Sequence, residues 1–219
     1  MKTKKTLYWI LMLLPLAAVL VALQFLPDQI PAHYGASGQV DRWGSKYETF
    51  VFPAFTAAFG GVMLALSRYA SRQEENGTNN EGVVLMAGLS GMALFNAMTL
   101  FFLFLAFRKT EDLSAAPVDL YQLLFGILGL GMVAIGNVMP KARMNSLIGL
   151  RTTWSMSSEK AWKKSQRFGG ISFILGGLAT VLASLLTKGF SCFLWSMGIL
   201  VSITAVDVVY TYLAAVRSA

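Results

Sequence analysis

The residues best suited to chemistry lie in two polar loops that interrupt an otherwise apolar chain of 219 residues. One loop, residues 26–50, carries His33 and Asp41, a pair that could share a hydrogen bond, contact a ligand or help to bind a metal ion. The other loop, residues 137–168, carries seven of the eighteen Lys and Arg residues, spaced among amide, small and aromatic side chains. Cations in such a setting suit contacts with anionic groups of lipids or proteins.

The first loop leaves three interpretations of its histidine open. His33 is the only histidine, and the His-Glu-x-x-His spacing of a helical zinc site is absent. The imidazole could be hydrogen-bonded within the loop or to Asp41, could contact a ligand at the outer surface, or could ligate a metal together with carboxylates. Because there is one histidine and no zinc-site spacing, the hydrogen bond within the loop is favoured, and we expect neither a metal nor a cofactor. The candidate residues of this loop are Pro31, His33, Gly38, Asp41, Trp43 and Lys46.

The second loop contains side chains that solubility does not require. Asn145 and Gly149 suit turns, Arg151 offers a planar fork of donors, and Trp154 suits a membrane interface. Residues 158–167 are expected to form a short amphipathic helix that lies along the inner leaflet with its cations toward anionic headgroups. Such a helix could simply anchor the loop, or it could dock a partner.

The elements that position these loops are expected to be membrane-spanning helices. The chain is 55% hydrophobic and 13% charged, with a mean hydropathy of +0.58, whereas a soluble domain carries about 25% charged residues. Six apolar runs are long enough to cross a hydrocarbon core of about 30 Å. They cover about residues 7–26, 49–67, 82–107, 120–139, 168–187 and 190–216. The predicted fold class is an all-α polytopic membrane protein with six transmembrane helices and one short cytoplasmic interfacial helix.

The six spans divide into two halves of three. We expect an N-terminal half, residues 1–110, with an extracytoplasmic His33/Asp41 loop, and a C-terminal half, residues 111–219, with a basic cytoplasmic loop at 139–167. Each half has its polar loop directly after its first span. Because three is odd, the halves would have inverted topologies, as in several transporter folds, although they share no obvious sequence similarity.

The distribution of basic residues predicts the orientation. With both termini inside, thirteen Lys and Arg residues lie in cytoplasmic segments and five in outer loops, which satisfies the positive-inside rule. The same rule accounts for the net charge of +7 without nucleic-acid binding. The first run could imitate a signal peptide, but it lacks a convincing cleavage site and is taken as an uncleaved span. Cys192 is the only cysteine, so an intramolecular disulfide is excluded.

One acidic residue, Asp207, falls inside the sixth span. A carboxylate there is costly unless it is paired or hydrated, and we expect Arg151, or failing that Arg167, to be its partner. The alternatives are a hydrated vestibule, or a hydrogen bond to Tyr210 or to a helix hydroxyl. One histidine, one cysteine and no paired intramembrane carboxylates leave too few catalytic groups, so the chain is not expected to be an enzyme.

The sequence NSLIGLRTTWSMSSEKAWKKSQRFGG resembles the signature of the SdpI family of bacterial immunity membrane proteins. The matching positions are Asn145, Gly149, Leu150, Arg151, Thr152, Trp154, Ser155, Trp162 and Arg167, with Asn137 in the preceding Gly-Asn pair. Thr153 stands where the family usually has proline. The first loop resembles the domain of unknown function that precedes this signature in longer members. There the matching positions are Ile30, Pro31, His33, Gly38, Asp41 and Lys46.

This resemblance implies a multi-pass protein of the bacterial cytoplasmic membrane that protects a cell from a secreted, membrane-active peptide toxin. It implies the lipid bilayer and the toxin as partners. It further implies that toxin binding holds a small cytoplasmic repressor at the membrane, without direct contact of the chain with nucleic acid. The alternative is a small transporter or exporter, of peptide or proton-coupled, with Asp207 in the coupling site.

Overall fold

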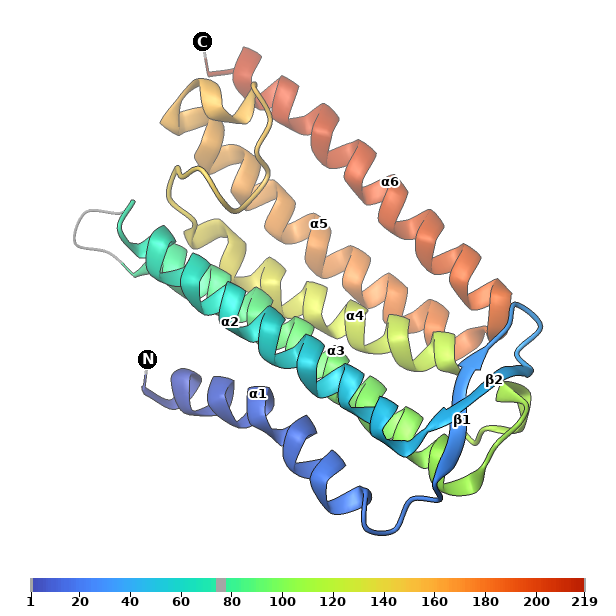
Figure 1. Cartoon of the computed structure of the whole chain (residues 1–219). Helices are drawn as coiled ribbons and strands as arrows, with labels where there is room; N and C mark the ends of the chain where they lie inside the picture. The colour runs from blue at the N-terminus through green and yellow to red at the C-terminus, as the bar shows by residue number, and fades with distance from the viewer. Residues whose placement is uncertain (1, 74–77, 219) are drawn as a thin grey trace.

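A computed structural model of the chain describes residues 2–73 and 78–218. Within these ranges six helices are long and apolar enough to cross a membrane (Figure 1). They are α1 Lys2–Ala22, α2 Val51–Ser71, α3 Asn79–Arg108, α4 Leu120–Val138, α5 Glu159–Leu186 and α6 Gly189–Val216. The chain is therefore a multi-pass membrane protein, and the predicted six-span architecture is confirmed. Only Thr187 and Lys188 separate α5 from α6, so these two helices form a tight hairpin.

The helices lie side by side, and the two chain termini lie at the same end of the bundle (Figure 1). Helix α3 packs against α1, α2 and α4, while α4 packs against α3, α5 and α6. We call the end with the termini and residues 139–158 the basic end. The opposite end, which a two-stranded sheet covers, is the hairpin end.

Glycines bring α4 and α5 into backbone contact. A Cβ atom added at Gly129 would lie 2.6 Å from the carbonyl oxygen of Gly177, and one added at Gly136 would lie 2.6 Å from that of Gly170. Small residues at such positions let membrane helices pack closely, where van der Waals contact is the main attraction available. These two helices carry the second loop between them, so their close packing fixes its ends.

The sheet was not predicted. Strands β1 (Gln29–Tyr34) and β2 (Val40–Ser45) form an antiparallel hairpin, followed by a 3-10 helix, η1 (Lys46–Phe50). The hairpin is tied to the loop that precedes α4, because the Val40 N–H donates to the Glu111 carbonyl at 2.9 Å. It is the one departure from the expected all-α class, and it orders a loop that the sequence alone presented as irregular.

The short interfacial helix predicted over residues 158–167 is not a separate element. These residues form the first turns of α5, which runs without a break into the apolar span. Ser158 caps the helix by accepting a hydrogen bond from the Ala161 N–H at 3.1 Å. Trp162 is 1% exposed and its Nε1 donates to the Ala142 carbonyl at 2.8 Å. The apolar face of this segment therefore packs against protein rather than against lipid.

Candidate functional site

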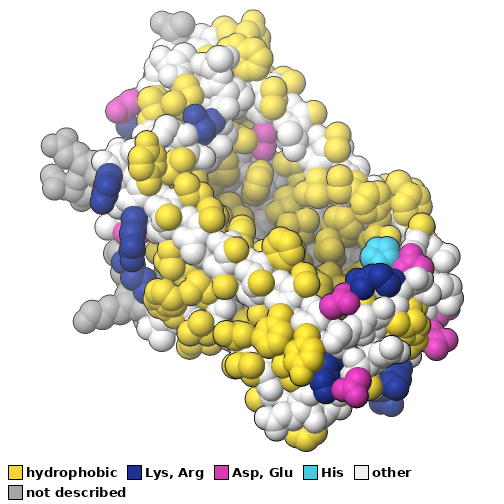
Figure 2. Space-filling view, in the orientation of Figure 1, with side chains coloured by type: hydrophobic (Ala, Val, Ile, Leu, Met, Phe, Trp, Pro, Cys, Tyr) yellow, Lys and Arg dark blue, Asp and Glu magenta, His cyan; other side chains and the backbone are white. Residues whose placement is uncertain are grey.

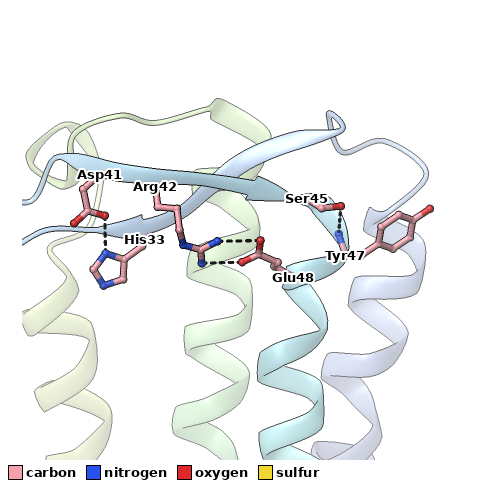
Figure 3. Close-up of polar contacts among 6 residues, drawn as sticks. All are labelled: His33, Asp41, Arg42, Ser45, Tyr47 and Glu48. Carbon is pink, nitrogen blue, oxygen red and sulfur yellow. Dashed lines mark hydrogen bonds and ion pairs between the residues drawn. The ribbon is translucent and has the colours of Figure 1, made fainter.

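Two side-chain pairs lie above the helix ends, one within the hairpin and one between the hairpin and η1 (Figure 3). His33 Nδ1 lies 2.6 Å from Asp41 Oδ1, which is the hydrogen-bonded arrangement expected of this histidine. Arg42 donates from both terminal nitrogens to the two carboxylate oxygens of Glu48, at 3.0 and 2.8 Å. Figure 3 shows His33 and Arg42 projecting from the strands toward the helices. The described residues contain no group of three His, Cys, Asp or Glu side chains that could hold a metal ion.

The remaining candidates of the first loop shape the hairpin. Lys46 donates to Asp28 at 2.9 Å, and this hydrogen bond and charge lower the pKa of the Asp28 carboxyl. Gly38 has φ +81° at the turn, a conformation that glycine adopts without steric cost. Pro31 is buried in β1, and its register partner Trp43 is exposed. The loop thus acts as a folded unit.

A pocket of about 440 Å³ lies beneath the hairpin, between the strands and the ends of α2, α3 and α4. Tyr34, Phe52, Phe102 and Tyr121 form an aromatic wall, in which Phe52 and Phe102 stack at 5.1 Å. Tyr34 donates its hydroxyl to the Thr110 carbonyl at 2.8 Å, and burial raises its pKa to about 12. The wall is therefore apolar toward the pocket, and the rim is polar.

At the basic end, Asn145 folds the second loop. Its Oδ1 accepts hydrogen bonds from the Leu147 and Ile148 N–H groups, both at 2.8 Å. Its Nδ2 donates to the Arg143 carbonyl at 2.7 Å. Asparagine forms this kind of turn because its short amide reaches the backbone two or three residues on. The turn predicted at Asn145 is present.

Gly149 and Gln166 fit each other closely. Gly149 has φ +93°, and an added Cβ atom would collide with Gln166 Oε1. Gln166 is fully buried; its Oε1 accepts from the Leu150 N–H at 3.0 Å and its Nε2 donates to the Leu150 carbonyl at 3.1 Å. Gln166 was not singled out from the sequence. Its spacing of four from Trp162 places both on one helix face, which is the signal that could have found it.

Thr152 joins the loop to the last helix. Its hydroxyl donates to Thr211 Oγ1 at 2.9 Å and accepts from the Ser155 N–H at 3.0 Å, where the 3-10 helix η4 (Ser155–Ser157) begins. Trp154 packs edge-to-face on Tyr212 of α6, with ring centroids 5.5 Å apart. A displacement of this loop would therefore act on α6 directly.

The signature residues divide into a folding set and an exposed set. Asn145, Gly149, Thr152 and Trp162 make the internal contacts described above. Asn137, Arg151 and Arg167 are exposed and make no side-chain hydrogen bond or ion pair with any residue that the structure describes. The exposed set is the part of the signature that is free to meet another molecule.

The expected ion pair of Asp207 with Arg151 or Arg167 is wrong. Asp207 is 1% exposed, and its Oδ1 accepts a hydrogen bond from the Ser172 hydroxyl of α5 at 2.6 Å. A hydroxyl within the bundle reaches the carboxylate without desolvating an arginine, which would add a second buried charge. The helix-hydroxyl alternative is the one observed.

Comparison with known protein families finds a match for each of the two loop regions. Residues 141–213 match the SdpI/YfhL protein family, and residues 10–57 match DUF1648, a domain of unknown function. The resemblance of residues 141–213 to the SdpI/YfhL protein family is thereby confirmed. The family match contains the folded second loop with α5 and most of α6, and the DUF1648 match contains the whole hairpin.

Two relatives extend these matches. The chain is 21% identical over 169 residues to "Immunity protein SdpI" of Bacillus subtilis (strain 168), covering 77% of this chain and 75% of that protein. It is 35% identical over 43 residues to an uncharacterized protein of Archaeoglobus fulgidus, covering 20% of this chain and 24% of that one. No solved structure matches. The first relative supports a role in a family of membrane immunity proteins and gives no indication of an enzyme.

Proposed function

We propose that this chain is an integral membrane immunity protein that protects a bacterium from a membrane-active peptide toxin. The observation that carries the proposal is the similarity to an immunity protein over three-quarters of both chains. The signature loop is also folded onto α5 and α6 through Gln166 and Thr152. An ordered loop is what a protein needs if it is to act through this segment.

The two ends would face opposite sides of the membrane. Thirteen of the eighteen Lys and Arg residues lie at the basic end, which favours a cytoplasmic location for that end and for both termini. The hairpin end would then meet a toxin secreted into the surroundings. In this orientation residues 1–110 supply the outer binding unit, and residues 111–219 supply the cytoplasmic loop.

A cytoplasmic partner would bind the exposed part of the signature. Arg151 and Arg167 are exposed cations whose donors are not used within the described chain, and arginine suits paired contacts with carboxylates. A small repressor with an acidic surface could dock there when the toxin is bound. The Thr152–Thr211 hydrogen bond gives the bundle a direct route to this loop.

Expression in a toxin-sensitive bacterium tests the function. Cells that make the protein should survive higher doses than cells with an empty vector, when both are treated with a panel of secreted membrane-active peptides. Tyr47→Ala, in η1 and outside the pocket lining, serves as a control and should protect normally. A dose response identical to that of the empty vector for every peptide would reject the proposal.

A proton-coupled transporter is the second candidate, and the buried Asp207 carboxylate is the observation that favours it. Transport and sequestration differ in their need for a gradient. A protonophore should abolish protection by an exporter and leave a sequestering receptor working. Uptake of labelled peptide into inverted vesicles that depends on Asp207 would favour transport.

A further inference from the structure

Most of the polar side chains that line the hairpin pocket are engaged within the protein. The hydroxyls of Tyr34, Thr49 and Thr99 each donate to a backbone carbonyl, at 2.8, 2.6 and 2.8 Å. Arg42 and Glu48 are joined to each other by two hydrogen bonds. An occupant of the pocket therefore gains little from hydrogen bonds with these groups and more from burying apolar surface.

Aromatic rings form the wall of the pocket and stay partly uncovered. Phe102 stacks on Phe52 with ring centroids 5.1 Å apart, and it meets Tyr34 at 6.4 Å with a tilt of 47°. Tyr121, in the first turn of α4, is 37% exposed. Aromatic rings attract one another in stacked and edge-to-face arrangements beyond the effect of the buried area. The wall thus favours an aromatic occupant over an aliphatic one of the same size.

The pocket has room for one large side chain. Its volume of about 440 Å³ is near the lower end of the range of about 300–1,000 Å³ that sites for single small ligands span. A helix, with a diameter of about 10–12 Å including its side chains, needs more space. A partner would therefore lie outside the pocket and insert a single side chain.

The rim of the pocket is charged, whereas the surface beside it is apolar. The side chains of the His33–Asp41 and Arg42–Glu48 pairs are all more than one-third exposed. Figure 2 shows the histidine and a charged cluster beside a hollowed, largely hydrophobic face. A partner that lies there meets polar groups on one side and apolar groups on the other, which is the pattern that an amphipathic peptide presents.

The depth of the pocket favours a peptide over a lipid as its occupant. Val51 and Leu120, which line it, are the first residues of α2 and α4, and Phe102 lies six residues, or about 9 Å, before the end of α3. At this level a phospholipid presents its headgroup, and its acyl chains run from there toward the centre of the bilayer. An amphipathic peptide in the plane of the interface instead buries its Trp, Phe or Leu side chains about 5–10 Å deep.

We propose that the hairpin pocket receives one aromatic side chain of an amphipathic peptide that lies in the outer interface of the membrane. The peptide backbone lies beside the charged rim, and the inserted ring packs among the rings of the wall. The inference rests on the proposed function for the orientation of the chain and for the natural peptide being a toxin. Insertion of the ring is a property of the pocket itself and can be measured with a synthetic peptide.

Photo-labelling of the full chain in phosphatidylcholine nanodiscs tests the inference. The probe is an amphipathic helical peptide of leucine and lysine with one p-azidophenylalanine on its apolar face, and mass spectrometry maps the labelled residues. Labels should concentrate on pocket residues of the hairpin and of α2, α3 and α4. Unlabelled peptide with phenylalanine at that position should compete at bilayer-bound concentrations about fivefold lower than peptide with cyclohexylalanine, because the two side chains differ mainly in aromaticity.

Variants locate the contact. Phe102→Leu and Tyr121→Leu should each reduce the preference for phenylalanine to about twofold, because each takes one ring from the wall. Tyr121 is exposed, so the fold tolerates its replacement more readily than that of a buried ring. Tyr47→Leu makes the same change in η1, outside the pocket lining, and should behave as the wild type.

Equal competition by the two peptides, or labels spread over the lipid-facing helices and unchanged by Phe102→Leu and Tyr121→Leu, would overturn the inference. An unlabelled pocket would overturn it as well and would leave a lipid as the alternative occupant. A pocket that takes the peptide, in a chain that protects no cell, keeps this inference and rejects the proposed function. Protection of cells by a chain whose pocket takes no label does the reverse.

Discussion

Gln166 of α5 binds both backbone polar groups of Leu150, sixteen residues earlier in the chain. This pair of hydrogen bonds comes from a fully buried side chain and holds the second loop against the helix that follows it. The loop is therefore positioned from α5, and its exposed arginines are presented on a fixed backbone.

Gln166→Ala should destabilise the protein, because it leaves the Leu150 N–H without its partner and removes one of the two donors to the Leu150 carbonyl, which Ser155 also reaches at 2.6 Å. An unsatisfied buried group costs about 1–3 kcal/mol. Thermal unfolding in detergent, followed by tryptophan fluorescence, should show a lower midpoint. Gln24→Ala, at an exposed glutamine, is the control and should leave the midpoint in place. A midpoint shared by both variants would show that the hydrogen bonds add nothing.

Gly149→Ala should also destabilise the loop, for two reasons. The positive φ disfavours any Cβ by about 1 kcal/mol or more, and the new methyl group would meet Gln166 Oε1. The double variant with Gln166→Ala should lose less stability than the sum of the two single losses, because both changes act on one contact. Strict additivity in the same unfolding assay would contradict this geometry.

Ser172→Ala should cost more stability than Arg151→Ala. The first change removes the hydroxyl that hydrogen-bonds the buried Asp207 carboxyl, at a cost of about 1–3 kcal/mol. The second removes an exposed side chain and should change stability by less than about 0.5 kcal/mol. Charge reversal of Arg151 together with Asp207 should give no mutual rescue; a rescue in unfolding measurements would restore the ion pair that the structure rejects.

The hairpin should loosen in acid. The hydrogen bond from Lys46 places the folded-state pKa of Asp28 below the value of about 3.9 in an unfolded chain. Its stabilising contribution is thus complete above that value and is lost as the pH falls through the folded pKa. Hydrogen exchange of the Lys46 N–H, which donates to the Asp28 carbonyl at 3.1 Å, should accelerate below pH 4 beyond its intrinsic trend. Asp28→Asn should remove that extra acceleration, and an unchanged profile would exclude Asp28 as its origin.

The sequence predicted the six spans because uncharged apolar runs of this length are rarely found outside membrane-spanning helices. It did not predict β1 and β2, since Pro31, Asp41 and Gly44 interrupt any alternation of apolar and polar residues. Their pairing depends on contacts with the loop before α4, which no local pattern reports. The change in composition at Phe168 predicts a boundary between the interfacial helix and the fifth span, but no proline or cap ends the helix there and α5 continues through it.

For a similar reason, the sequence predicted some residues of the candidate sites and not others. Asn145 and Gly149 show their roles through residue type, because turns and positive φ select asparagine and glycine. Gln166 and Ser172 do not, since their importance lies in partners 16 and 35 residues away along the chain. A carboxylate within a span predicts a cationic partner, whereas the neutral Ser172 hydroxyl is the group that hydrogen-bonds Asp207.

The orientation of the bundle is the claim on which the outer pocket and the cytoplasmic signature both depend. Single cysteines at Ser37 and Ser157, both exposed, can be labelled in intact cells with a membrane-impermeant maleimide, since the native Cys192 is buried. The account predicts that Ser37→Cys reacts in intact cells and that Ser157→Cys reacts only after the membrane is permeabilised. Labelling of Ser157→Cys in intact cells, with or without Ser37→Cys, would contradict it.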